Sequence, residues 1–495
     1  ISLKFINFTF MSEVLQNSIS SRDGQTFVFD TFDKVKTVFE SQIANRQNVK
    51  NRSAEERKDK LNLLNNEILK HRTEIEEALF KDLKKHKIEA GYSEIFPTLS
   101  EIRNISRNLR RWMRSNPVKN SLPFIGSKSK ILLEPKGNCL IITPWNYPFY
   151  LSMTHLAVCI ASGNVAILKT SEYSPNVSKV IKEILSGVFE EDEVAVIFTG
   201  AEVSTEMPKL PFDHIHFTGS TNVGKQIMKN ASNNLTSVTL ELGGKSPVII
   251  DENYPIKDCI KQIGWGKFLN AGQTCIAPDY ILVHKDKKDE FVDKLSTYLK
   301  DSFGEKSTDS EFLTGIVNKS HFKRIENLLQ DAVSDGNQIV FGGKMDESRL
   351  AFGPTLLMMN SSAAIMEEEI FGPVLPIVLY NDVEDAIKFI TKKHKPLAMY
   401  LFSNDKKWLN EVLLNTSSGG VCINDTMAHF VQTYLPMGGV NHSGIGKSHG
   451  YFGFKEFSNE RAVLKSYIKG GITWPFQFPY TKLKKNILEI LIKYF

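Results

Sequence analysis

The sequence predicts an α/β protein in which parallel strands alternate with helices, and three observations support this fold class. From residue 138 onward, short apolar segments alternate with helical stretches, which is the pattern of βαβ units and a parallel sheet. The same alternation resumes over residues 247–377 with different loops, so a second α/β domain is expected to begin near Gly244. At 495 residues the chain is also too long for one hydrophobic core, and two or three domains are expected.

Helices are expected to precede the first sheet. Residues 52–115 are rich in Glu, Lys, Arg and Leu, and their apolar residues recur at helical spacing. Farther along, Ser174-Pro175 suits the start of a helix, and Gly163 and Gly187 suit helix ends. Four apolar segments between these signals are predicted to be strands of the first sheet: Cys139–Ile142, Val165–Leu168, Val194–Phe198 and His214–Phe217.

The turn after the last of these strands is a candidate phosphate site. Gly219 and Ser220 stand at the start of the next helix, where backbone N–H groups and the helix dipole suit a phosphate or pyrophosphate. The spacing is not G-x-G-x-x-G, and taken alone the segment is better explained by an ordinary tight turn. Lys169-Thr-Ser-Glu172 follows another strand at its carboxyl end, where ligands bind in open α/β sheets, although a solvated loop explains it too.

Cys275 lies in a segment with the features of a reactive loop. A helical run over residues 256–270 is expected to end at Gly272, and Pro278 prevents a new helix before the strand Tyr280–Val283. The turn therefore displays one cysteine between two rigid elements. From this segment alone, a nucleophile and a buried structural cysteine are about equally good interpretations.

Composition excludes several classes of function. Lys plus Arg (61) barely exceed Asp plus Glu (56) and are scattered, which is not the pattern of a nucleic-acid-binding protein. Five widely spaced cysteines without a CxxC pair indicate a reducing, cytoplasmic setting without structural zinc. Gly244-Lys245-Ser246 resembles part of a P-loop, but its first glycine is missing. The pair His214 and His216 lacks a third ligand at a recognisable spacing, so no metal site is expected and satisfied histidines are the better interpretation.

The two ends of the chain carry separate expectations. Residues 1–10 lack the core of a signal peptide and lead into Met11, which we expect to be the true start. The apolar run 486–495 is about half of the roughly 20 residues that span a bilayer. A terminal helix packed on the body is the favoured interpretation, and a weak peripheral membrane contact is the alternative.

Three further segments complete a recognisable pattern. They run from Ile141 to Pro148, with Asn146 between two prolines, from Thr239 to Pro247, with Glu241 before a glycine pair, and from Glu367 to Pro376. Together with the Cys275 segment they resemble the aldehyde dehydrogenase superfamily. The segments Leu435–Gly446 and Gly450–Arg461 are similar to class 3, the branch for fatty and aromatic aldehydes. The resemblance to the superfamily covers roughly residues 30–495. Met437 and Asn441 depart from the usual Phe and Gly in a loop expected near the substrate entrance.

The resemblance implies NAD(P)-dependent oxidation of aldehydes to carboxylic acids. Cys275 would be the nucleophile, Asn146 and the Cys275 N–H would form the oxyanion hole, and Glu241 would activate the water that hydrolyses the thioester. The thiol would need a pocket that favours its anion. NAD is the implied cofactor, with some use of NADP. The implied cofactor-binding residues are Lys169, Glu172, Gly219, Ser220, Val223, Gly224, Glu369 and Phe371.

The resemblance also implies the domain organisation and a homodimer. A CoA-acylating dehydrogenase, a cysteine hydrolase and a non-catalytic protein on the same fold remain alternatives, although the last should lack Cys275, Asn146 or Glu241. The implied domains are an N-terminal extension (1–25), a Rossmann-like NAD-binding domain (26–116 and 136–243), a catalytic domain (244–458), strands that pair subunits (117–135 and 459–470) and a C-terminal tail helix (471–495).

Overall fold

The first sheet contains the four strands that the sequence predicts. In the computed structural model, which describes residues 18–22 and 24–494, its order is β19-β9-β8-β5-β6-β7. Five of the strands are parallel, and only the short β19 pairs antiparallel, to β9. The strands are β5 (Asn138–Ile142), β6 (Val165–Thr170), β7 (Val194–Phe198), β8 (His214–Thr218), β9 (Ser237–Glu241) and β19 (Gly444–Ile445).

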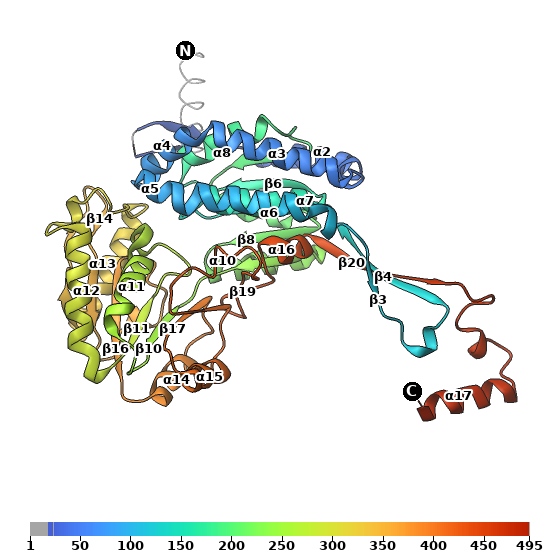
Figure 1. Cartoon of the computed structure of the whole chain (residues 1–495). Helices are drawn as coiled ribbons and strands as arrows, with labels where there is room; N and C mark the ends of the chain where they lie inside the picture. The colour runs from blue at the N-terminus through green and yellow to red at the C-terminus, as the bar shows by residue number, and fades with distance from the viewer. Residues whose placement is uncertain (1–17, 23, 495) are drawn as a thin grey trace, which may run out of the picture.

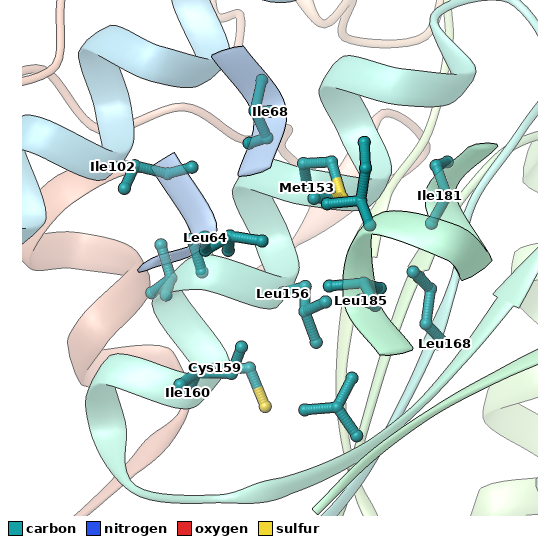
Figure 2. Packing of buried hydrophobic residues seen from close by; sticks show 14 of the residues in the cluster. Leu64, Ile68, Ile102, Met153, Leu156, Cys159, Ile160, Leu168, Ile181 and Leu185 are labelled. Atoms are coloured by element: carbon teal, nitrogen blue, oxygen red, sulfur yellow. The ribbon is translucent and has the colours of Figure 1, made fainter. Parts of the chain in front are cut away.

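Both faces of this sheet are covered by helices, because alternate side chains of each strand point to opposite faces. Cys139 and Ile141 of β5 belong to the core shared with α7 and α8, whereas Leu140 and Ile142 pack with α2 and α10. Figure 2 shows the first core, where Leu64 and Ile68 of α3 and Met153 and Leu156 of α7 lie close together. The helices are α2 (Phe32–Lys50), α3 (Ala54–Lys70), α4 (Arg72–Leu83), α5 (Lys87–Ala90), α6 (Phe96–Trp112), α7 (Pro148–Ser162), α8 (Pro175–Ser186), α9 (Ala201–Glu206), α10 (Thr221–Ala231) and α16 (Gly450–Glu456).

Local signals explain where these helices begin and end. Ser53 and Glu56 form a reciprocal capping box at the start of α3. Gly163 ends α7 with a left-handed φ of 90°, and Gly187 ends α8, as predicted. Pro175 begins α8, although Ser174 makes no capping bond with its side chain.

The second sheet follows the same principle with more strands. Its order is β12-β15-β16-β11-β10-β17-β18, and every pair except β12 with β15 is parallel. Helices α11 and α12 cover one face, and α13, α14 and α15 cover the other. The elements are β10 (Pro247–Ile250), α11 (Ile260–Phe268), β11 (Tyr280–His284), α12 (Lys288–Phe303), α13 (Lys319–Ser334), β12 (Gln338–Phe341), β13 (Met345–Asp346), β14 (Ala351–Phe352), β15 (Thr355–Met358), β16 (Val374–Tyr380), α14 (Val383–Thr391), β17 (Ala398–Phe402), α15 (Lys406–Asn415) and β18 (Gly420–Ile423).

A third, antiparallel sheet projects from the body (Figure 1). It consists of β3 (Asn116–Val118), β4 (Ser127–Pro135) and β20 (Ser458–Ser466), in the order β20-β4-β3. The register between β20 and β4 runs without a break from Ser458 opposite Pro135 to Ser466 opposite Ser127. These strands overlap residues 117–135 and 459–470, which the family resemblance implies for subunit pairing.

The expectation that the tail packs on the body is wrong for the described residues. Helix α17 (Lys482–Tyr494) has no buried residue, and Figure 1 shows it beyond the third sheet, apart from both larger sheets. Leu483, Ile490 and Ile492 are all mostly exposed. Within the described chain, no helix combines the length and the apolar character that crossing a membrane requires.

The other end of the chain is only partly described. Residues 1–17, including the expected start at Met11, lie outside the described residues. Within the predicted extension, β1 (Ser18–Ser20) pairs with β2 (Thr26–Val28), and the Arg22 guanidinium donates to the carbonyl of Val317 at 2.9 Å. The last residues of this segment are therefore attached to the folded body.

Candidate active site

The predicted catalytic residues lie where the first sheet meets the second. Glu241 is the last residue of β9 and Asn146 follows β5, so both stand at the carboxyl edge of the first sheet. Cys275 precedes β11 of the second sheet. Gly243 lies directly against the Glu369 carboxylate, which a side chain at this position would displace.

The loop that carries Cys275 is held in one conformation. The predicted helix over residues 256–270 is shorter than expected, because α11 ends at Phe268 and Asn270 and Ala271 adopt left-handed φ values of 54° and 51°. The Asn270 side-chain amide compensates for this strain by donating to the carbonyls of Asn146 and Gln273, each at 3.0 Å.

The Gln273 side chain then ties this turn to a distant segment. Its amide nitrogen donates to the Asn270 carbonyl at 3.0 Å and to the Gly315 carbonyl at 3.1 Å, and its oxygen accepts from the Val317 N–H at 3.0 Å. All of the hydrogen-bonding capacity of this buried amide except one lone pair is therefore used.

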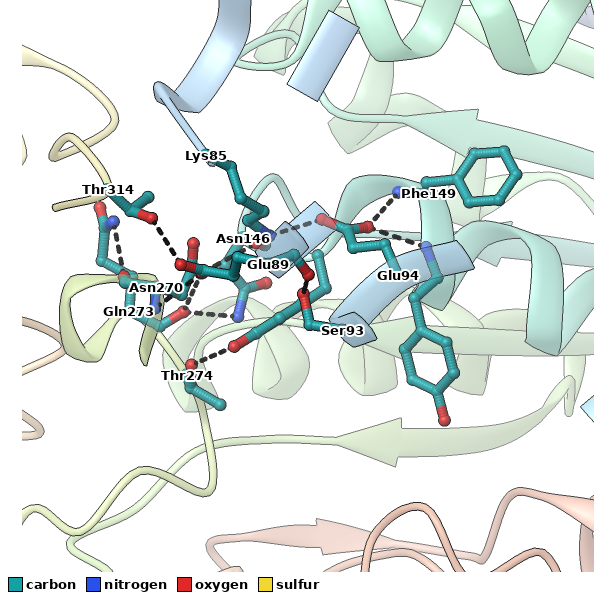
Figure 3. A network of polar contacts seen from close by, with 12 residues as sticks. Lys85, Glu89, Ser93, Glu94, Asn146, Phe149, Asn270, Gln273, Thr274 and Thr314 are labelled. Atoms are coloured by element: carbon teal, nitrogen blue, oxygen red, sulfur yellow. Dashed lines mark hydrogen bonds and ion pairs between the residues drawn. The ribbon is translucent and has the colours of Figure 1, made fainter. Parts of the chain in front are cut away.

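A buried network of charged residues, which the sequence did not predict, supports the same loop (Figure 3). Lys85 is fully buried, and its ammonium donates to Glu94 at 2.6 Å and to the Asn146 carbonyl at 3.2 Å. The other Glu94 oxygen accepts from the N–H groups of Phe149 and Tyr150, each at 3.0 Å, at the start of α7. A carboxylate there satisfies two unpaired donors and complements the helix dipole.

Glu89 performs a similar role on the other side of the loop. It accepts from the Asn270 N–H at 2.9 Å and from the Thr314 hydroxyl at 3.1 Å. Burial raises the pKa of Glu89, and the nearby Lys85 partly offsets this effect. Charged residues in a Lys- and Glu-rich helical stretch resemble a solvated face, so no sequence pattern distinguished Lys85, Glu89 and Glu94 from their exposed neighbours.

Asn146 is placed beside the nucleophile loop. Its side-chain nitrogen donates to the Gln273 carbonyl at 3.0 Å, and this amide nitrogen carries a second hydrogen. Next to it, the Tyr147 hydroxyl lies 2.8 Å from the Thr274 hydroxyl. The structure thus brings Asn146 next to the residues that immediately precede Cys275.

Glu241 is buried among histidines. One carboxylate oxygen accepts from the Ser448 hydroxyl, and the other lies 3.6 Å from Nε2 of His155. Burial raises the pKa of Glu241, but the surrounding imidazoles of His155, His216 and His449 outweigh burial and lower it. The carboxylate is therefore ionised at neutral pH and able to accept a proton.

The environment of Cys275 disfavours its thiolate. Burial raises the pKa of the thiol well above its usual value, and the carboxylates of Glu369 and Glu241 raise it further. Burial and the charge of Asp279 raise the pKa of Glu369 itself to about 8. Burial and these two carboxylates therefore act against the thiolate that the resemblance implies for Cys275.

A cavity of about 590 Å³ opens in front of Cys275. Aromatic and aliphatic side chains dominate its wall, and Lys261 and Asp425 are the charged residues among those that line it. Neither Met437 nor Asn441 lines it: Met437 is buried in the core of the second sheet, and Asn441 accepts from Lys395 at 3.1 Å. Its apolar lining includes Tyr92, Pro97, Tyr147, Tyr150, Leu151, Trp265, Leu269, Tyr298, Met427, Phe430 and Val431.

The predicted nucleotide residues cluster at the ends of β6 and β8. Lys169 and Glu172 form an ion pair of 2.7 Å beyond β6. Ser220 caps α10 by accepting from the Val223 N–H at 3.4 Å, and Val223 is 49% exposed at the helix start. A helix start at the carboxyl edge of the sheet fits a pyrophosphate, and the ion pair fits ribose hydroxyls.

Two glycines and an aromatic residue are the remaining predicted cofactor residues. A Cβ on Gly219 would lie 2.5 Å from the Phe217 ring, and one on Gly224 would lie 2.7 Å from Leu242, so a side chain at either position would displace its neighbour. Phe371 has a left-handed φ of 48° and meets Trp145 edge to face at 5.5 Å. Glu369 and Phe371 occupy one loop on the side of Cys275.

Comparison with known proteins agrees with this geometry. The aldehyde dehydrogenase family model matches residues 29–463. The chain is 45% identical to 4,4'-diaponeurosporen-aldehyde dehydrogenase of Staphylococcus aureus over 422 residues, 85% of this chain and 91% of that protein. It is 41% identical to mouse aldehyde dehydrogenase family 3 member A2 over 424 residues, 86% and 87% of the two chains. Among solved structures, Staphylococcus aureus AldH in a substrate-bound state superposes with a TM-score of 0.87 at 42% identity, covering 92% of this chain and 99% of that one.

Proposed function

The chain belongs to the aldehyde dehydrogenase family and is an NAD(P)-dependent aldehyde oxidoreductase, and on this premise we propose that Cys275, Asn146 and Glu241 perform the reaction. The observation that carries the assignment is the position of Cys275. It is the only partly exposed cysteine among the described residues, and it lies on the wall of the apolar cavity. Asn146 adjoins its loop, and Glu241 lies near enough for its charge to raise the pKa of the thiol.

The reaction assigned to these residues proceeds in two stages. The Cys275 thiol loses its proton to solvent and the sulfur adds to the aldehyde carbon, while the Asn146 side-chain N–H and the Cys275 N–H donate to the oxygen that becomes negative. When bound, the dinucleotide would accept the hydride that leaves the adduct carbon, and a thioester on Cys275 would remain. Glu241 then takes a proton from water as the water oxygen attacks the thioester carbon, and the bond from that carbon to Cys275 breaks.

We assign medium- or long-chain aliphatic and aromatic aldehydes as the substrate class. A cavity of about 590 Å³ has the size of a typical small-molecule site, and its aromatic wall favours an apolar substituent over a charged one. Each buried CH₂ of a bound substrate would contribute about 0.8 kcal/mol. The activity kcat/KM should therefore rise with chain length until the cavity is filled.

NAD is the proposed preferred cofactor, with some use of NADP. The Glu172 carboxylate suits ribose hydroxyls and repels a 2′-phosphate, whereas its partner Lys169 tolerates one. The discrimination between the two nucleotides should therefore be modest.

The proposed assembly is a homodimer formed through the third sheet. Strand β20 pairs with β4 on one edge only, and Leu464 on this strand is 50% exposed. An open strand edge with apolar residues is a surface for pairing with another chain.

For α17, whose apolar residues are uncovered, we propose a weak peripheral membrane contact in a cytoplasmic protein.

The experiment that tests the proposed function measures NADH and NADPH formation with aldehydes from about two to sixteen carbons. The intact protein should oxidise the longer aldehydes most efficiently, with NAD preferred, and Cys275→Ala should be inactive while still binding NAD. Cys422→Ala, which changes another cysteine of the same sheet region, is the matched control and should stay active. Turnover by Cys275→Ala would reject the nucleophile, and turnover that requires added CoA would indicate an acylating dehydrogenase instead.

A further inference from the structure

Two histidines from different elements converge on the carboxylate of Glu241. His216 of β8 and Glu241 of β9 lie on neighbouring parallel strands, and His155 comes from α7. The two imidazole rings have centroids 4.0 Å apart, and Nε2 of His155 lies 3.6 Å from Oε2 of Glu241. One ligand atom from each residue lies within 4.8 Å of the other two. The sequence did not indicate His216 as a ligand, because His155 and Glu241 are distant from it along the chain.

The two rings lack the hydrogen bonds that buried imidazoles require. His155 and His216 are 2% and 1% exposed, and neither ring nitrogen of either residue has a partner in residues 18–22 and 24–494. The expectation of satisfied histidines is therefore wrong for His216. A buried neutral imidazole presents one N–H donor and one lone pair, and leaving both unpaired costs free energy. Unpartnered buried nitrogens of this kind call for a partner outside the protein, a water molecule or an ion.

We propose that His155, His216 and Glu241 form a binding site for a divalent transition-metal ion of the zinc type. Two imidazole nitrogens and one carboxylate oxygen are a known zinc donor set, and they leave a fourth position open. Calcium and magnesium prefer oxygen ligands, so the two nitrogens select against them.

The geometry is close to what such an ion requires. Bonds of about 2.0–2.1 Å in a tetrahedral site place ligand atoms about 3.3 Å apart. The separation of 3.6 Å between His155 and Glu241 already meets this within a few tenths of an ångström, and ring rotations would shorten the others. The second Glu241 oxygen stays bonded to the Ser448 hydroxyl, which lies 2.8 Å from Nδ1 of His449. That bond would orient the metal-binding oxygen.

A metal at this position would switch off the second half of the reaction, an effect that rests on the proposed function of Glu241. The lone pair of Oε2 that would accept the proton of the hydrolytic water would instead bind the ion. Formation of the thioester on Cys275 does not need this lone pair. Zinc should therefore spare the first turnover and stop hydrolysis.

Binding is tested on the full chain carrying Cys275→Ala, which removes the reactive thiol as a competing ligand. Titration with Co²⁺ should give d–d absorption that saturates at a single ion per chain, and Zn²⁺ should displace it. His155→Gln and His216→Gln, each added singly, should abolish the absorption. His214→Gln is the matched control: His214 lies two residues away on β8 and is also buried, but it contacts Lys136 and Ser237, and its loss should leave binding intact.

Two results would overturn the site: absence of bound Co²⁺ or Zn²⁺ at millimolar concentration, or binding that survives both the His155 and the His216 substitution. Circular dichroism shows whether each variant is folded, and one folded variant suffices because either substitution removes a ligand. The activity of the intact protein separates the site from the proposed function. Zinc binding that preserves the NADH burst and lowers the steady rate supports both. Binding at the site that leaves the steady rate unchanged keeps the site and rejects Glu241 as the base.

Discussion

Lys85→Met is expected to weaken both the fold and the reaction, because Lys85 links a buried carboxylate to the loop of the active site. Lys85 and Glu94 are both fully buried and lie 2.6 Å apart. The same ammonium donates to the carbonyl of Asn146 at 3.2 Å. Methionine preserves most of the volume but leaves Glu94 charged and facing only the N–H groups of Phe149 and Tyr150.

The magnitude follows from the complete burial of this pair. Removal of one partner from a buried ion pair costs about 3–5 kcal/mol, a large share of the roughly 5–15 kcal/mol that stabilises a typical protein. Asn146 would also lose a donor that fixes its backbone. A displacement of about 1 Å in a catalytic group lowers the rate by about 10²-fold. The value of kcat should therefore fall, while the affinity for NAD should not change.

The assay is urea unfolding followed by tryptophan fluorescence, together with aldehyde kinetics. The double variant Lys85→Met/Glu94→Gln should recover part of the lost stability, because no unpaired charge remains. Lys388→Met is the exposed control: Lys388 and Glu384 lie 3.3 Å apart with side chains 66% and 70% exposed, and such pairs contribute less than about 1 kcal/mol. A cost for Lys85→Met no larger than that of the control would refute the reasoning.

Four further predictions concern the site and the tail. Glu241→Gln should release a single turnover of NADH and then leave an acyl group on Cys275, visible by mass spectrometry of the peptide; rapid steady turnover would reassign the base. Glu172→Gln should shift the kcat/KM ratio of the two nucleotides towards NADP, and an unchanged ratio would remove Glu172 from the ribose site. Because the pKa of Glu369 is raised to about 8, its proton is held more tightly in the folded state, so stability should fall as pH rises from 4.5 to 8. Denaturation at several pH values should show that Glu369→Gln reduces this fall, and an equal slope in the variant would contradict the raised pKa. Deletion of residues 486–495 should abolish co-sedimentation with anionic liposomes and leave unfolding of the body unchanged, since α17 has no buried residue; retained co-sedimentation would reject the membrane contact.

The fold class and the turn that carries Cys275 were accessible from the sequence. Apolar strands such as Val194–Phe198 and helix ends such as Gly163 are local signals, because backbone geometry and burial on both faces impose them over a few residues. The turn around Cys275 was predicted for the same reason. The interactions that stabilise this turn were not predicted, because the left-handed Asn270 is held by hydrogen bonds to Asn146, which is distant in the sequence, and to Gln273.

The sequence by itself determined the alternation of strands and helices, the motifs that place Cys275, Asn146 and Glu241 on loops and strand ends, and the family that these motifs indicate. Only the tertiary structure decided what surrounds them. Lys85 is a buried partner of Glu94, and His216 faces His155 and Glu241. The sequence segments around Lys85 and His216 show no local pattern that indicates these contacts. The physical reason is that charge, burial and metal-binding geometry depend on distances between elements, and the spacing of residues along a chain does not contain those distances.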